Sequence, residues 1–205
     1  MILLLAALSI ATEFVRLDFA YTAPLREETV REEARQRRFP GELLLRVPQP
    51  EDTSGLPVLV LRRTCPSLED CQRLARIRLV NGGIRVESAV WSTDGHLSTR
   101  PGPIVVTNLY YPKPGQKDAV HRQRLLASSV RAKIGLDAGV VLKRLTASNI
   151  LPEVLWWAEY PDQAARSTDV AASTASAEFE AVRQKMGTLL DHFERVVWAP
   201  ALETR

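Results

Sequence analysis

The sequence predicts an α+β fold made of two copies of one βαββαβ module, arranged in tandem and packed sheet to sheet. Three short matches indicate the duplication, because they occur in the same order in both halves of the chain. The matching segments are 21–24 (YTAP) with 111–114 (YPKP), 56–66 with 151–161, and 90–91 (VW) with 197–198. Ordered self-similarity is typical of a repeated supersecondary unit. We therefore expect a first module over residues 1–92, a linker over 93–103 and a second module over 104–205.

Periodicity and turn residues predict the elements of the first module. Alternating apolar residues predict strands over 14–21, 42–47, 58–64 and 84–91. A Pro-containing turn precedes the charged segment 25–38, whose pattern predicts an amphipathic helix with Glu–Arg pairs on its solvent face. A second helix is expected after Pro66, with Ser67 as its N-cap.

The second module repeats this order. Strands are expected over 104–111, 139–145, 153–160 and 193–198, and a long first helix over 116–134. A second helical region should begin after Pro161 with Asp162 as its N-cap. The offset between the copies grows from 151 − 56 = 95 to 197 − 90 = 107 across this region, so it holds about 12 additional residues. The polar run 173–176 predicts a break between two helical pieces.

Composition excludes several classes of function. The chain has 205 residues, of which 45% are hydrophobic, so it can form a sizeable core. Its net charge of +3 is mild, and its densest charged run, 26–38, alternates Glu with Arg and does not form a basic patch. Nucleic acid is therefore not an expected partner. Three scattered histidines and the absence of a CxxC pair predict no metal site.

The apolar N-terminus and the two cysteines bear on location. Residues 1–11 lack a positively charged start and are too short to span a membrane. We interpret them as an element leading into the fold, with a signal segment as the alternative. Cys65 and Cys71 are interpreted as reduced thiols of a cytoplasmic protein, with a disulfide as the alternative.

The amino-acid sequence of the second module resembles the dimeric α/β-barrel superfamily. Segments 154–170 (VLWWAEYPDQAARSTDV) and 175–198 (ASAEFEAVRQKMGTLLDHFERVVW) carry the resemblance, which points to antibiotic-biosynthesis monooxygenases and to stress-responsive and NIPSNAP-like proteins. The resemblance implies two ferredoxin-like modules whose sheets pack together and enclose a cavity. A tandem chain can form one such barrel alone, so we expect a pseudo-dimeric monomer, with a homodimer as the alternative.

Haem-degrading members of that superfamily use an Asn on the first strand, an aromatic residue after the third strand and a His in the second helix. Asn108 and Tyr160 fit the first two positions, but the third falls near Arg183, where no His is present. Haem is therefore not expected, and no other cofactor is implied.

Strand alternation predicts which side chains face the cavity between the sheets. In the first module Val15, Leu17, Phe19 and Tyr21 are expected to face the helices, which turns Arg16 toward the second sheet. The same reasoning yields two groups of candidate residues. The predicted catalytic residues are Asn108, Glu159 and Glu194, and the predicted ligand-binding residues are Tyr110, Trp157, Trp198, Arg16, Arg62 and Arg85.

Two functions fit this arrangement. The first is a small-molecule-binding barrel. If this barrel is an enzyme, we expect a cofactor-independent monooxygenase, or an isomerase or cyclase, that acts on an aromatic or polyketide-like compound. The second is a non-catalytic stress-response or assembly protein of the same fold. A cavity lined by Asn108, Trp157 and Glu159 would favour the first, and an interior filled with Arg–Glu pairs would favour the second. The sequence contains no nucleophile elbow, phosphate-binding glycine loop or HExxH motif, which excludes the corresponding hydrolases, kinases and zinc proteases.

Overall fold

The computed structural model describes residues 13–37, 39–50, 52, 55–79 and 83–201. The first half forms β1 (Phe14–Tyr21), a short 3₁₀ turn (Pro24–Arg26), α1 (Glu27–Gln36), β2 (Glu42–Arg46), β3 (Leu59–Cys65), α2 (Leu68–Arg73) and β4 (Arg85–Thr93). The second half forms β5 (Ile104–Pro112), α3 (Lys117–Lys133), β6 (Val140–Arg144), β7 (Val154–Tyr160), α4 (Gln163–Ala175), α5 (Ala177–Leu189) and β8 (Leu190–Pro200). Each element lies within a few residues of its predicted position.

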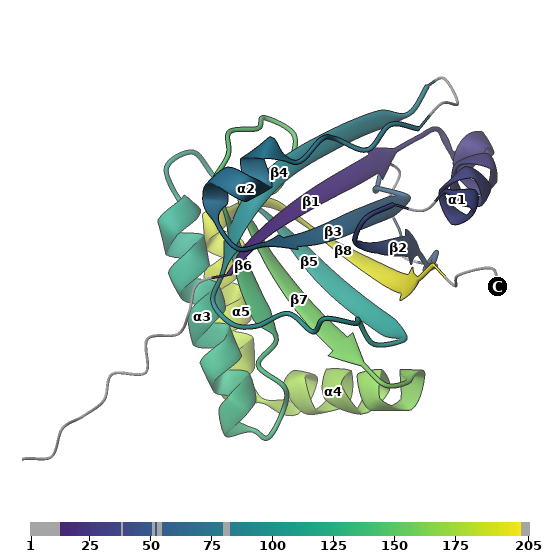
Figure 1. Cartoon of the computed structure of the whole chain (residues 1–205). Coiled ribbons are helices and arrows are strands. Elements are labelled where there is room, and N and C mark those ends of the chain that lie inside the picture. Colours follow the sequence, from purple (N-terminus) through teal and green to yellow (C-terminus); the bar gives the residue numbers. More distant parts are fainter. Residues whose placement is uncertain (1–12, 38, 51, 53–54, 80–82, 202–205) are drawn as a thin grey trace, which may run out of the picture.

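The strands close into one barrel in the order β1-β3-β2-β8-β5-β7-β6-β4 (Figure 1). Within it the halves have the same internal order, β4-β1-β3-β2 and β8-β5-β7-β6. Antiparallel pairs β2·β8 and β4·β6 join the two half-sheets on both sides. This arrangement confirms the predicted α+β fold of two ferredoxin-like modules packed as a dimeric α/β-barrel.

Apolar side chains from every strand fill the barrel interior. They form one cluster that includes Val15, Leu17, Phe19, Trp91, Trp157 and Trp198, with Tyr21 packed against it. The expectation that alternate residues of β1 face the helices is therefore wrong, because Val15, Leu17 and Phe19 point into the barrel. In a barrel of eight strands the interior is just wide enough for side chains, so it is packed as a core. Both faces of β1 are covered, and alternation alone does not tell which face is which.

The register of β1 places Arg16 and Asp18 outside the barrel, under α2. The Asp18 carboxylate is fully buried and accepts a hydrogen bond from Arg16 Nε at 3.0 Å and another from Arg63. Arg16 also donates to the carbonyl of Cys71 in α2 at 3.3 Å. Buried charges require such pairing, and these residues occupy the space between sheet and helix in the first module.

A disulfide joins Cys65 at the end of β3 to Cys71 in α2. The expectation of two reduced thiols is wrong. Ser67 caps α2 by accepting from the amide of Asp70 at 3.1 Å, as predicted, and the tight turn brings the two Cα atoms to 5.4 Å, within the range that a disulfide spans. Disulfides persist mainly in oxidising compartments, so this bond argues against the cytoplasmic location, which stays a prediction.

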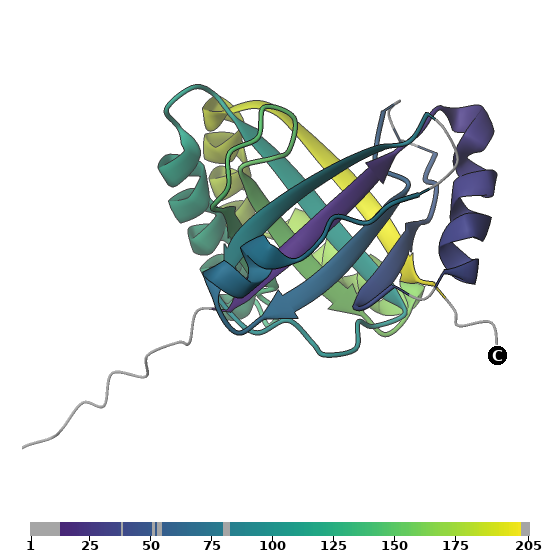
Figure 2. The same cartoon turned by 45° about the horizontal axis from the view of Figure 1, so that its top comes forward.

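In Figures 1 and 2, α3 and α5 pack side by side on one side of the barrel, with α4 beside the end of β7, and α1 lies on the other side. The short α2 packs on the outer face of β1 and β3. The predicted cap of α4 is confirmed, since Asp162 Oδ1 accepts from the amide of Ala165 at 2.7 Å. The predicted break is confirmed at Ser176, which ends α4 and caps α5. No helix within the described ranges is long and apolar enough to cross a membrane.

Reduction of the disulfide should lower stability. Opening the short loop between Cys65 and Cys71 restores chain entropy to the unfolded state, a loss of about 2 kcal/mol in the free energy of unfolding. The expected result is a melting temperature several degrees lower in dithiothreitol. The double variant Cys65→Ser/Cys71→Ser provides the control and should not respond to the reductant. Equal melting of the wild type with and without dithiothreitol would contradict the prediction.

Candidate functional site

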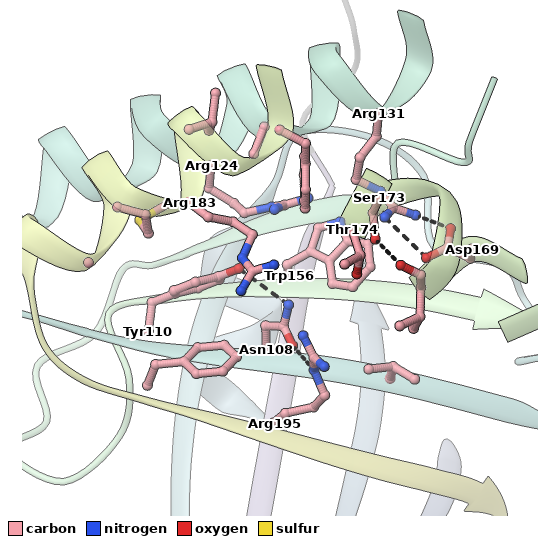
Figure 3. A pocket seen from close by; sticks show the side chains of 18 of the residues that line it. Asn108, Tyr110, Arg124, Arg131, Trp156, Asp169, Ser173, Thr174, Arg183 and Arg195 are labelled. Atoms are coloured by element: carbon pink, nitrogen blue, oxygen red, sulfur yellow. Dashed lines mark hydrogen bonds and ion pairs between the residues drawn. The ribbon is translucent and has the colours of Figure 1, made fainter. Parts of the chain in front are cut away.

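A cavity of about 490 Å³ lies between the outer face of the second half-sheet and the helices that cover it (Figure 3). This volume is within the range of small-molecule sites. Strands β5, β7 and β8 form its floor, and α3, α4 and α5 form its walls. Its aromatic lining residues are Tyr110, Trp156, Tyr160, Phe179 and Phe193, and its charged ones are Arg124, Arg131, Arg166, Asp169, Arg183 and Arg195.

Asn108 lies at the centre of the cavity floor. In the antiparallel register it stands between Trp156 of β7 and Arg195 of β8, so the three side chains share one face. Its amide oxygen accepts from Arg195 Nε at 3.0 Å, and its amide nitrogen donates to the Tyr110 hydroxyl at 3.4 Å. Asn108 therefore fixes an arginine and a tyrosine toward the same space.

Helix α3 supplies two buried arginines, Arg124 and Arg131. They are seven residues apart, two helical turns, and so lie on the same face. Their guanidinium carbons stand 4.7 and 4.8 Å from the centre of the Trp156 ring, within cation–π range. The Trp156 indole N–H donates to the carbonyl of Ala138 at 2.9 Å, which fixes the ring orientation.

Arg131 is neutralised by Asp169 from α4. Two hydrogen bonds join them, Nη2 to Oδ1 at 2.5 Å and Nη1 to Oδ2 at 3.2 Å. The Tyr160 hydroxyl also donates to Asp169 Oδ2, at 3.0 Å. Burial, together with the Asp169 charge, raises the pKa of Tyr160 to about 12, so Tyr160 stays protonated and this group is a structural triad.

Arg124 has no such partner. Its exposed fraction is 4%, its Nη2 makes one long hydrogen bond to Ser128 Oγ at 3.4 Å, and its Nε makes none. Among the described residues no carboxylate forms an ion pair with it. Burial lowers the pKa of Arg124, with Tyr110 opposing and Arg131 adding to that shift, but a guanidinium remains charged at neutral pH. The cavity therefore contains an uncompensated buried cation.

Of the predicted site residues, two line this cavity, Asn108 and Tyr110. Trp157, Trp198 and Arg62 point into the barrel, where Arg62 lies 5.3 Å from the Trp157 ring centre. Arg16 is outside the barrel, under α2, which corrects its expected position facing the second sheet. The packed apolar core also replaces the ligand cavity expected between the sheets.

Glu159 and Glu194 lie on two strands that flank β5. In register Glu159 stands opposite Val105 and Glu194 opposite Leu109. Glu159 accepts from Trp157 Nε1, Ser98 Oγ and the amide of Gly102 at 2.8 to 3.0 Å, and borders a smaller cavity of about 140 Å³. Glu194 accepts from the Tyr111 hydroxyl at 3.0 Å, and Arg85 stacks over Tyr21. Neither carboxylate lines the large cavity, and their predicted catalytic roles stay predictions.

Sequence reasoning missed Arg124, Arg131, Trp156 and Asp169. A weak signal existed for the arginines, because a heptad spacing places two cations on one helix face opposite a strand. The sequence pattern pointed to Trp157 and not to its neighbour Trp156. Two adjacent tryptophans face opposite sides of the strand, and nothing in the sequence indicates which side the helices cover.

No protein-family model matches the chain, and no curated protein matches it in sequence. Solved structures match its fold. An anthrone oxidase-like protein gives a TM-score of 0.61 at 13% identity, covering 92% of this chain and 91% of its own. A Fusobacterium nucleatum protein provisionally named a monooxygenase gives 0.50 at 10% identity, covering 93% of each chain. A Listeria monocytogenes ferredoxin-fold protein related to antibiotic biosynthesis monooxygenases gives 0.43 at 12% identity, covering 95% and 98%. The first two likenesses support the dimeric α/β-barrel fold, and at these identities they show the fold alone.

The absence of a side chain at Gly139 should be essential to the position of the Trp156 ring. Its φ is +65°, and a Cβ there would lie 2.2 Å from Trp156 Nε1. Gly139→Ala should displace the ring and lower the free energy of unfolding by about 1–3 kcal/mol beyond the backbone cost. Gly135→Ala is the matched control, because φ is +78° there and its Cβ would meet open space. The comparison uses denaturant unfolding and tryptophan fluorescence, and equal effects of the two substitutions would contradict this role.

Proposed function

We propose that the chain binds an aromatic small molecule in the cavity between the second half-sheet and α3–α5. The unpaired buried guanidinium of Arg124 carries the proposal. Burying a charge without a counter-charge is costly, and an anionic oxygen of a ligand would remove that cost. The aromatic side chains around it suit a planar ligand.

We further propose that the ligand is an enolisable aromatic ketone and that the reaction is its oxygenation. Loss of a C–H proton to water would leave an enolate whose oxygen lies against Arg124, with Tyr110 and Asn108 beside it. Preorganised cations and hydrogen-bond donors stabilise such a developing charge. O₂ would add at the carbanion carbon, and the hydroperoxide, once protonated by water, would lose water to leave a quinone. For anthrone, one O₂ is consumed and one water released for each anthraquinone.

One observation supports oxygenation over the isomerase or cyclase alternative: the name of one fold neighbour refers to an anthrone oxidase. The electrostatics of the cavity suit an enolate, which all three reactions can share. A barrel filled with Arg–Glu pairs would favour the non-catalytic alternative. The interior is mainly an apolar cluster, and Arg62 pairs there with Glu42 at 3.5 Å and with Glu159 at 3.9 Å.

Arg124→Met is the decisive variant. It keeps apolar bulk against Trp156 and removes the unpaired charge, so the unfolding midpoint should stay equal or rise. Binding of 2-naphthol, followed by tryptophan quenching, should weaken about tenfold. With anthrone, oxygen uptake and anthraquinone absorbance should show kcat/KM reduced about 100-fold.

Arg122→Gln is the matched control for charge, because Arg122 is exposed on the same helix and does not line the cavity. It should leave both measurements unchanged. Failure of the wild type to bind 2-naphthol would overturn the binding proposal. Binding without any anthrone oxidation would overturn the oxygenation proposal and leave the binding proposal standing.

A further inference from the structure

Three more arginines border the same cavity from three different elements. Arg166 comes from α4, Arg183 from α5 and Arg195 from β8. Arg183 is exposed and Arg166 is half-buried, so these two lie toward the solvent side of the site, whereas Arg124 is buried; Arg195 is also exposed, and its Nε reaches inward to Asn108 on the cavity floor. In Figure 3 the side chains of Arg183 and Arg195 extend toward Asn108 and Tyr110. The arginines therefore stand at two depths.

The partners of these three arginines do not neutralise the group. Within the described part of the chain, the Arg166 side chain donates to two amide oxygens, Gln49 Oε1 and Gln163 Oε1, both at 3.4 Å. Arg195 donates to the amide of Asn108 at 3.0 Å. Arg183 forms one ion pair with Glu180 of its own helix at 3.3 Å, between two half-exposed side chains. Surface pairs of this kind contribute little.

Charge counting gives the same result for the described lining residues. Five arginines border the cavity, and the carboxylate among the lining residues, Asp169, is already bound to Arg131. Flexible side chains that repel one another and are free to turn into solvent would normally diverge. Their convergence on one opening indicates a site for a second negative charge.

From this we infer that the ligand is an aromatic carboxylate, whose ring lies in the cavity with its ionisable oxygen at Arg124 and whose carboxylate is bound at the mouth by Arg166, Arg183 and Arg195. This rests on the proposed function and names its substrate class. The planar guanidinium fork matches a carboxylate in geometry and charge. Guanidinium groups on α4, α5 and β8 would together select ligands that carry the acid group at the end remote from Arg124.

The test compares two ligands that differ only in the acid group. 6-Hydroxy-2-naphthoate carries its hydroxyl and carboxylate at opposite ends of the ring system, and 6-hydroxy-2-naphthamide is its neutral counterpart. The full-length wild type should bind the carboxylate at least tenfold more tightly, as measured by tryptophan quenching. A higher salt concentration should weaken binding of the carboxylate ligand and leave binding of the amide ligand unchanged.

Variants of the arginines test which residues produce the preference for the carboxylate ligand over the amide ligand. Arg166→Gln and Arg183→Gln should each weaken binding of the carboxylate ligand several-fold, and the double variant should bind the carboxylate and the amide with equal affinity. Glu180→Gln should strengthen binding of the carboxylate ligand, because it removes the anion that competes for Arg183. Amide binding should stay constant in all of them, and Arg122→Gln should change neither ligand.

The outcomes separate this inference from the proposed function. Equal binding of the two ligands by the wild type, or equal weakening of both in the arginine variants, would overturn the carboxylate inference and leave the aromatic site standing. If neither naphthalene ligand nor 2-naphthol binds, the proposed function fails and this inference fails with it.

Discussion

Closure of the barrel is the constraint on which the other features depend. Pairs β2·β8 and β4·β6 join the half-sheets of one chain, so the apolar inner faces of both modules are packed against each other. The interior is filled by side chains such as Trp91, Trp157 and Trp198. The large cavity lies instead outside the barrel, between the second half-sheet and its helices.

The two modules use that outer layer differently, and one pair of equivalent positions explains much of the difference. Asp18 of β1 and Asn108 of β5 occupy the same place in the repeat, since 108 − 18 equals the 90-residue offset of the first strands. The Asp18 carboxylate pairs with Arg16 and Arg63, and the short α2, held by the disulfide, covers them. Asn108 cannot neutralise a guanidinium. The arginines around it remain available, and the longer α3, α4 and α5 enclose a cavity above them.

This asymmetry links packing to chemistry. In the first module the polar groups of the outer layer bind one another, so the layer is a second core. In the second module Asp169, the acid among the described residues that line the cavity, is shared between Arg131 and Tyr160, and its pairing orients Arg131 on Trp156. That triad supports the wall of the cavity, and no described carboxylate pairs with Arg124. A stable frame around an unsatisfied cation is what a binding site for an anionic ligand requires.

The order of strands and helices could be predicted from the sequence alone, because alternation, capping residues such as Asp162 and the ordered repeat are local signals. So could the polarity of Asn108 and Tyr110 and their place on one strand. The face on which they act could not, since strands covered on both sides are apolar on both sides and only closure of the barrel decides which face is enclosed. The Cys65–Cys71 bond depends on the geometry of one tight turn, since the two residues are only six positions apart. The union of Arg124, Asn108 and Arg195 in one cavity depends on distances between segments far apart in the chain, which only the tertiary structure sets.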